Sequence, residues 1–197
     1  DLTDVVGLGA DALASAGFDA SPGSSLVVAQ DGHPLVLVGV GDPAELDADK
    51  LRDAAAAAAR ATAKKGGRLG VDVPELGIDA RTVGQVITEG ALLARYRYSV
   101  LKAETKEVPL AVLQLRVAGA DAAAVTDGIG AGQIGVRATV VARDLANTPP
   151  GHLTATNLAA VAVELGATYG FDVAAFDKQQ LIEMGCGGIL GVNAGSA

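Results

Sequence analysis

The sequence predicts an α/β protein in which helices pack on a mostly parallel or mixed sheet. Short apolar runs alternate with segments of helical periodicity between residues 26 and 117, an order typical of layered α/β domains. Half of the 197 residues are hydrophobic and only 3% are aromatic. The core must therefore be built from Val, Leu, Ile and Ala, as in buried parallel sheets. The Pro149-Pro150 pair then ends a long helical pattern and predicts a boundary with a second domain.

Four apolar segments are predicted strands: residues 26–29, 35–40, 68–73 and 110–117. The first two flank residues 30–34, where Asp-Gly predicts a turn. His33 lies in that turn without a partner at ligand spacing, so we expect an exposed side chain and not a metal ligand. Residues 1–25 are polar and Gly-rich and predict no clear element.

Three long helices are predicted, over residues 47–64, 79–98 and 121–147. Asp47 or Asp49 can cap the first, and its run of alanines favours close packing. An interior glycine is costly in a helix, so Gly90 indicates a close contact with a neighbouring element. Tyr96 and Tyr98, at the end of the second helix, are expected to pack half-buried and not to stack on a ligand.

A possible dinucleotide motif lies inside the third helix. Residues 130–135 spell G-x-G-x-x-G, but that fingerprint requires a strand that ends at the first glycine and an acid about 20 residues later. The preceding strand ends near Val117, and no acid stands near Leu153. We therefore interpret the glycines as a helix face that lies close against another element.

Charge and cysteine content exclude several classes of protein. A net charge of −8 argues against a nucleic-acid partner. The single cysteine, Cys186, cannot form an internal disulfide, which favours a reducing compartment. No apolar run approaches the roughly 20 residues that span a bilayer, and no leader precedes Asp1. We expect a cytoplasmic protein without a membrane partner, whose native N-terminus has been trimmed or is not included in these residues.

The region after Pro150 predicts a short helix–strand alternation. Thr154 can cap a helix to about Leu165, residues 171–176 and 188–192 are predicted strands, and a short helix covers residues 177–184. This is too little chain to bury its own core. The carboxylates Asp172, Asp177 and Glu183 are spaced as capping or solvated residues, His152 as a surface residue, and Cys186 as a small core residue at a strand entrance.

Three segments, in order, resemble the leucyl (cytosol) aminopeptidase family. Residues 89–98 contain Glu-Gly-x-x-Leu-x-x-Tyr-x-Tyr, similar to the end of that family's N-terminal domain. Residues 142–150, Ala-Arg-Asp-Leu-Ala-Asn-Thr-Pro-Pro, followed by Leu153-Thr154, resemble its inter-domain stretch A-R-D-L-x-N-x-P. Residues 183–196 resemble its G-M-G-x-x-x-x-V-x-x-G-S segment, although Asn193-Ala194 replaces the usual Gly-Gln, and Ala155 replaces a usual proline.

The resemblance implies a two-lobed metallo-exopeptidase that releases N-terminal amino acids from peptides and assembles as a homo-hexamer. It implies an N-terminal α/β domain at 1–118, a linker helix and junction at 119–149, and the start of the catalytic domain at 150–197. Arg143, Leu145, Asn147 and Pro149 are expected to be structural residues of the junction.

The family's chemistry implies two divalent metal ions, Mn or Zn, that activate a bridging water. The segments that supply the ligands resemble V-G-K-G-x-x-F-D-S-G-G and N-T-D-A-E-G-R, and neither occurs in these 197 residues. No catalytic, metal or substrate-binding residue is assigned here, and we expect the chain alone to be a truncated, inactive form that binds no metal. The alternative is a non-catalytic α/β module that binds a nucleotide-like ligand or organises subunits.

Overall fold

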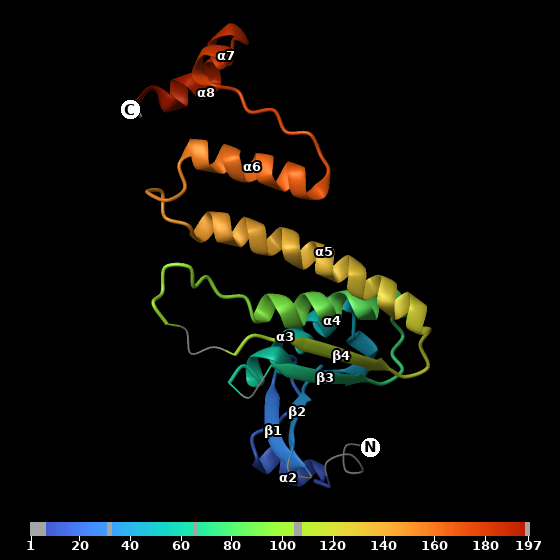
Figure 1. Ribbon diagram of the computed structural model, residues 1–197. Helices are drawn as coiled ribbons and strands as arrows, with labels where there is room; N and C mark the ends of the chain where they lie inside the picture. The colour runs from blue at the N-terminus through green and yellow to red at the C-terminus, as the bar shows by residue number, and fades with distance from the viewer. Residues whose placement is uncertain (1–6, 31–32, 65–66, 105–107, 196–197) are drawn as a thin grey trace. The chain divides into compact units, whose positions relative to one another are not determined.

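A computed structural model describes residues 7–30, 33–64, 67–104 and 108–195 (Figure 1). The chain forms two compact units, Asp1–Asp144 and Leu145–Ala197. Helices and strands alternate through the first unit, which confirms the predicted α/β class. No described helix is both long enough and apolar enough to cross a membrane.

The strands of the first unit form two separate pairs instead of one sheet. Strands β1 (Ser25–Gln30) and β2 (His33–Val38) form an antiparallel hairpin in which Gln30 pairs with His33. Strands β3 (Arg68–Val73) and β4 (Val112–Val117) are parallel. All four predicted strands are thus present. The expected turn residues Asp31 and Gly32 lie outside the described ranges, and His33 opens a strand but is exposed, as expected.

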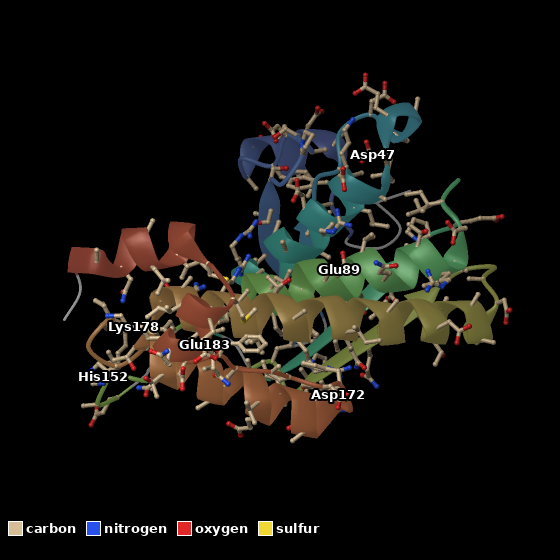
Figure 2. All side chains as sticks on the ribbon, turned by 90° about the horizontal axis from the view of Figure 1, so that it is seen from above. Asp47, Glu89, His152, Asp172, Lys178 and Glu183 are labelled. Carbon is tan, nitrogen blue, oxygen red and sulfur yellow. The ribbon has the colours of Figure 1, made fainter. Side chains whose placement is uncertain are left out.

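The long helices begin where the sequence predicted. Helix α3 (Ala48–Ala61) is capped by Asp47, whose Oδ1 accepts a hydrogen bond of 2.8 Å from the N–H of Lys50; Figure 2 shows Asp47 at the start of this helix. Helix α4 (Ala80–Ala94) is capped by Asp79, and α5 spans Ala122–Asn147. Helix α4 ends four residues before the predicted Tyr98, and α3 three residues before Lys64.

Two small elements of the first unit were not predicted. They are helix α2 (Ala10–Ser15) and the 3-10 helix η1 (Pro43–Glu45). Helix α2 lies in the stretch where the sequence gave no clear signal. Its Leu13 is buried with Phe18 and Leu37 of β2, so this short helix closes a small core beside the hairpin.

The main core lies where α3, α4 and one face of the β3–β4 pair meet. Its buried side chains are Leu51, Ala55, Val73, Val83, Val86 and Ile87. A neighbouring cluster joins Ala59, Leu69 and Ala91. The alanine run of α3 lets it lie close to α4, and a Cβ on Gly90 would meet the carbonyl oxygen of Arg52 at 2.1 Å. The predicted close contact at Gly90 is confirmed.

The other face of the β3–β4 pair is exposed and polar. Arg116 of β4 donates from Nε and Nη2 to the two carboxylate oxygens of Asp72 on β3, at 2.7 and 2.8 Å. Both side chains remain largely in solvent, where such a pair contributes little stability. Helices of the described residues therefore cover this parallel pair on one face only.

The regular elements of the second unit, in its described residues, are all helices. It contains α6 (Ala155–Tyr169), α7 (Lys178–Glu183), α8 (Gly187–Val192) and η2 (Asn193–Gly195). The predicted caps are confirmed, since Thr154 caps α6 and Asp177 forms a capping box with Gln180 at α7.

The two strands predicted in the second unit are wrong. Residues 171–176 are irregular, and residues 188–192 belong to α8. A strand needs a neighbour to satisfy its backbone hydrogen bonds, whereas a helix satisfies them within its own segment. Cys186 accordingly stands at the N-cap of α8, half-buried, and not at a strand entrance.

Candidate functional site

The end of helix α4 and the residues after it contact Arg143 and Asp144 of helix α5, within the first unit. Residues 89–98 form the last turns of α4 and the chain that follows it, while residues 142–147 close α5. Helix α5 stops at Asn147 because Pro149 and Pro150 cannot continue it. Two of the sequence segments that looked distinctive are therefore joined in space.

Tyr96 is the centre of this meeting point. Its hydroxyl donates a hydrogen bond of 2.8 Å to Oδ1 of Asp144. The guanidinium carbon of Arg143 lies 5.4 Å from the centroid of the Tyr96 ring, within the range of a cation–π contact. Tyr96 and Tyr98 are both half-buried, which confirms the packing expected of these tyrosines. Sequence reasoning assigned Arg143 to the junction but missed its contact with Tyr96.

Arginine side chains bind carbonyl oxygens at the C-terminal ends of α4 and α3. Nη1 of Arg143 contacts the carbonyl oxygen of Leu93, in the last turn of α4, at 3.4 Å. Arg95 donates to the carbonyl oxygens of Ala59 at 3.1 Å and Ala63 at 3.4 Å, at the end of α3, and also to that of Val108. The last carbonyls of a helix have no partner within the helix and carry partial negative charge, so a guanidinium there is favourable.

Glu89, labelled in Figure 2, ties α4 to α3. Its Oε2 accepts a hydrogen bond of 2.8 Å from Nε of Arg52, and its Oε1 accepts one of 2.9 Å from Gln85. The Glu89 side chain is 15% exposed and that of Arg52 is 34% exposed. The hydrogen bond to Glu89 is the main cause that raises the pKa of Arg52 above its ordinary value, while partial burial opposes the rise. The pair is a structural tie and not an acid–base couple.

The remaining junction residues lie at the end of α5 and in the turn after it. Leu145 is half-buried, while Asn147 and Pro149 are exposed. The carbonyl oxygen of Pro149 accepts hydrogen bonds from the N–H groups of His152 at 2.8 Å and Leu153 at 3.0 Å. This turn leads directly to the cap of α6. His152, labelled in Figure 2, is exposed as expected.

The G-x-G-x-x-G pattern lies wholly inside helix α5. A Cβ on Gly132 would meet the carbonyl oxygen of Gln85 in α4 at 2.7 Å, whereas a Cβ on Gly130 would meet no described atom within 4 Å. No helix begins at these glycines, so their amides cannot cradle a pyrophosphate. The interpretation as a helix face that lies close against another element is confirmed at Gly132.

A small cavity of about 240 Å³ lies at the carboxyl ends of β3 and β4. It is lined mainly by the loops that lead from these strands into α4 and α5, and Glu75 and Asp121 are among the lining residues. Ligand pockets usually measure about 300–1,000 Å³. Its size and two carboxylates make it a poor site for a phosphate-bearing ligand.

The described residues do not fit a metal centre. Nowhere in the described ranges do three His, Cys, Asp or Glu side chains gather to hold an ion. Asp177 caps α7, Glu183 accepts a hydrogen bond of 3.3 Å from Gln179, and Asp172 is exposed. Figure 2 shows Asp172 and Glu183 at separate places. No chemical step through a metal is derived from these side chains.

Comparisons with known proteins match both parts of the chain. Residues 2–105 match the N-terminal domain of the cytosol aminopeptidase family, and residues 140–197 match its catalytic domain. A protein of Chlorobaculum tepidum named probable cytosol aminopeptidase is 34% identical over 98% of this chain and 42% of its own length. One of Roseiflexus castenholzii with the same name is 37% identical over 82% of this chain and 34% of its own length.

Solved structures agree with the sequence matches. The bottromycin maturation enzyme BotP in complex with Mn has a TM-score of 0.79 at 33% identity, over 96% of this chain and 40% of that chain. A mutant tomato leucine aminopeptidase has a TM-score of 0.78 at 22% identity, over 92% of this chain and 37% of that chain, and shows the same fold.

Both matched domains are those of an aminopeptidase. The chain belongs to the cytosol aminopeptidase family, which confirms the resemblance carried by residues 89–98, 142–150 and 183–196. It spans 42% of the length of the Chlorobaculum tepidum relative and 34% of the length of the Roseiflexus castenholzii relative.

Proposed function

We propose that this chain is the front portion of a metal-dependent aminopeptidase that releases N-terminal amino acids from peptides. The observation that carries the proposal is the match of residues 2–105 and 140–197 to the two successive domains of one aminopeptidase family. The likeness to BotP, whose structure contains Mn, supports a metal-dependent reaction. In this proposal residues 1–118 form the N-terminal domain, 119–149 the linker helix and junction, and 150–197 the start of the catalytic domain.

The junction has a structural role in this proposal. Arg143, Leu145, Asn147 and Pro149 end the linker helix and direct the chain into the next domain. The contacts of Arg143 with Leu93 and Tyr96 support that role, as does the turn that Pro149 closes with His152. None of these residues is proposed to touch substrate.

The metal ions, Mn or Zn, would be held by residues other than those described here. The 197-residue chain alone is therefore proposed to bind no metal and to be inactive. The intact enzyme is proposed to be a cytoplasmic homo-hexamer with peptide substrates and without nucleic-acid or membrane partners. The acidic net charge of −8 supports the exclusion of nucleic acid.

An activity assay tests the proposal. The 197-residue chain and the longer enzyme are each incubated with leucine p-nitroanilide and Mn²⁺. We expect turnover by the longer enzyme and none by the chain. Turnover by the repurified chain would contradict the proposal that the metal ligands lie outside it. A lack of turnover by the longer enzyme, with Mn²⁺ and also when Zn²⁺ replaces it, would contradict the aminopeptidase activity. Light scattering of the chain should show a species smaller than a hexamer.

The binding-module alternative is tested separately by calorimetry with ADP-ribose or NAD. We expect no heat at high micromolar ligand, because the G-x-G-x-x-G glycines lie inside α5 and carboxylates rim the cavity at β3 and β4. Saturable heat with either ligand would favour the alternative.

A further inference from the structure

We propose that Tyr96, Arg143 and Asp144 form a lock that fixes the point at which the chain leaves helix α5, and that this lock positions the catalytic domain for turnover. The second half of this inference rests on the proposed function, whereas the first half concerns the 197-residue chain alone. The three residues are named the Tyr96 lock below. They are proposed as positioning residues, which act through the path of the chain and not by contact with substrate.

The need for a lock follows from how α5 is packed. The buried residues of this helix are Val125, Gly128, Gly132 and Val136. The helix continues from there to Asn147 without another buried residue. Val140, Val141 and Leu145 of this stretch are only half-buried. Most helix stability in proteins comes from packing, and weakly packed helix ends fray. The last turns of α5 therefore depend on the contacts that side chains such as Arg143 and Asp144 make.

Two adjacent residues of α5 hold Tyr96 at different places. Asp144 accepts the phenol hydrogen bond at 2.8 Å, and Arg143 covers the ring at 5.4 Å. A hydrogen bond to an ionised carboxylate is stronger than one between neutral groups. Neighbouring residues of a helix are separated by a fixed rotation about its axis and a fixed rise along it. The two contacts together therefore define how this turn of α5 is rotated about the helix axis and where it lies along that axis.

Tyr96 is itself anchored to the core of the first unit. Its N–H donates a hydrogen bond of 3.3 Å to the carbonyl oxygen of Leu93. The preceding residue, Arg95, donates to the carbonyl oxygens of Ala59 and Ala63 at the end of α3. The Tyr96 lock thus connects the last turn of α5 to two helices of the main core, and not merely to a mobile loop.

The lock lies directly before the second unit. Asp144 is the last residue of the first unit and Leu145 the first of the second. A change in the position of Asp144 moves the start of the next unit, because Pro149 restricts the few residues that could absorb it. The lock would therefore fix the exit of the chain.

Hydrogen exchange of the 197-residue chain tests the lock itself. Tyr96→Phe keeps the ring and removes only the phenol donor, so it should raise exchange in residues 137–147 roughly fivefold while α4 is unchanged. Asp144→Ala should raise exchange by a similar factor, and Asp144→Asn should raise it less. The double variant Tyr96→Phe/Asp144→Ala should raise exchange no more than either of its two single variants. Tyr169→Phe, which alters an exposed tyrosine of α6, is the control. Unchanged exchange in Tyr96→Phe, or additive effects in the double variant, would overturn the lock.

Kinetics of the longer enzyme test the positioning role. Tyr96→Phe should lower kcat for leucine p-nitroanilide several-fold and leave KM unchanged, because Tyr96 does not touch substrate, and Asp144→Asn should restore part of the rate lost in Asp144→Ala. An active wild-type enzyme whose kcat is the same in Tyr96→Phe would overturn the positioning role. An inactive wild-type enzyme would instead overturn the proposed function and with it the positioning role, while the exchange result on the chain would still decide the lock.

Discussion

A Cβ placed on Gly128 of helix α5 would lie 1.9 Å from the carbonyl oxygen of Arg81 in helix α4. The same pattern recurs along the two helices, since a Cβ on Gly84 would lie 2.4 Å from the carbonyl oxygen of Val125. These distances are well inside van der Waals contact, so only glycine permits the two backbones to approach this closely. Small residues thus decide where α5 lies on α4.

Gly128→Ala should destabilise the first unit by about 3 kcal/mol, because backbone atoms cannot move aside as a flexible side chain can. Gly130→Ala is the matched control, two residues away in the same helix, where a Cβ would meet no described atom within 4 Å. It should stabilise the protein by up to about 1 kcal/mol, since alanine favours helix more than glycine. Urea unfolding followed by circular dichroism measures both. Equal effects of the two substitutions would contradict the packing of α5 on α4.

Glu89→Gln should reduce the free energy of unfolding by about 1–2 kcal/mol. The substitution removes a charge whose carboxylate is largely buried against Arg52 and leaves the guanidinium without its main ion-pair partner in a partly desolvated place. The cost is lower than for a fully buried pair because Arg52 is 34% exposed. Urea unfolding again gives the value.

Glu45→Gln provides the control for this prediction. Glu45 pairs with Lys50 at 3.1 Å, but its side chain is 71% exposed, so its loss should cost less than about 0.5 kcal/mol. If Glu45→Gln were as destabilising as Glu89→Gln, burial would not be the reason that the sequence places a glutamate at position 89.

The elements of the first unit that carry local signals could be predicted from the sequence. Asp47 and Asp79 begin their helices as expected because a side-chain cap is a local interaction. Strand β3 was predicted at its observed bounds, since its apolar run is short and bounded by glycine and proline. Pro149 likewise indicated where the long helix ends.

The predictions that failed concern structure that depends on partners distant in the chain. Residues 188–192 have a strand-like composition but no described neighbour to pair with, so they form helix. The pairing of strands into two sheets also had no local signal. The hydrogen bond between Tyr96 and Asp144 spans 48 positions, and the sequence did not predict it. Long-range pairing cannot be read from local periodicity.

Stability should depend on pH through Asp79 at the start of α4. Hydrogen bonds from the side chain and the backbone N–H of Thr82 hold the pKa of Asp79 below its ordinary value. A carboxyl group with a lowered folded-state pKa stabilises the fold above its unfolded-state pKa of about 3.9. That stabilisation is lost as the pH falls through the lower folded-state pKa.

Asp79→Asn isolates this contribution, because asparagine caps helices about as well but does not titrate. The Tm of the wild-type chain should exceed that of Asp79→Asn near pH 6, and the difference should shrink as the pH falls from 5 to 2. Thr82→Val should reduce the same pH dependence, since it removes the hydroxyl that contributes most to the shift. A Tm difference between the wild-type chain and Asp79→Asn that stays constant from pH 6 to pH 2 would show that Asp79 does not cause the pH dependence.

Protection against hydrogen exchange should differ between the two units. Val83, Ile87 and Thr88 of α4 are the largest fully buried side chains of the described residues, and every described hydrophobic residue in the core belongs to the first unit. In the second unit large apolar side chains are exposed, among them Phe171 at 52% and Val192 at 92%. Amides exchange through openings whose free energy follows buried apolar contact. Helix α4 should therefore exchange most slowly and α6 to α8 much faster, as measured by mass spectrometry of peptides from the native chain. If α6 exchanged as slowly as α4, the second unit would have a stability of its own that its burial does not explain, and the proposal that it is only the beginning of a larger domain would lose its physical basis.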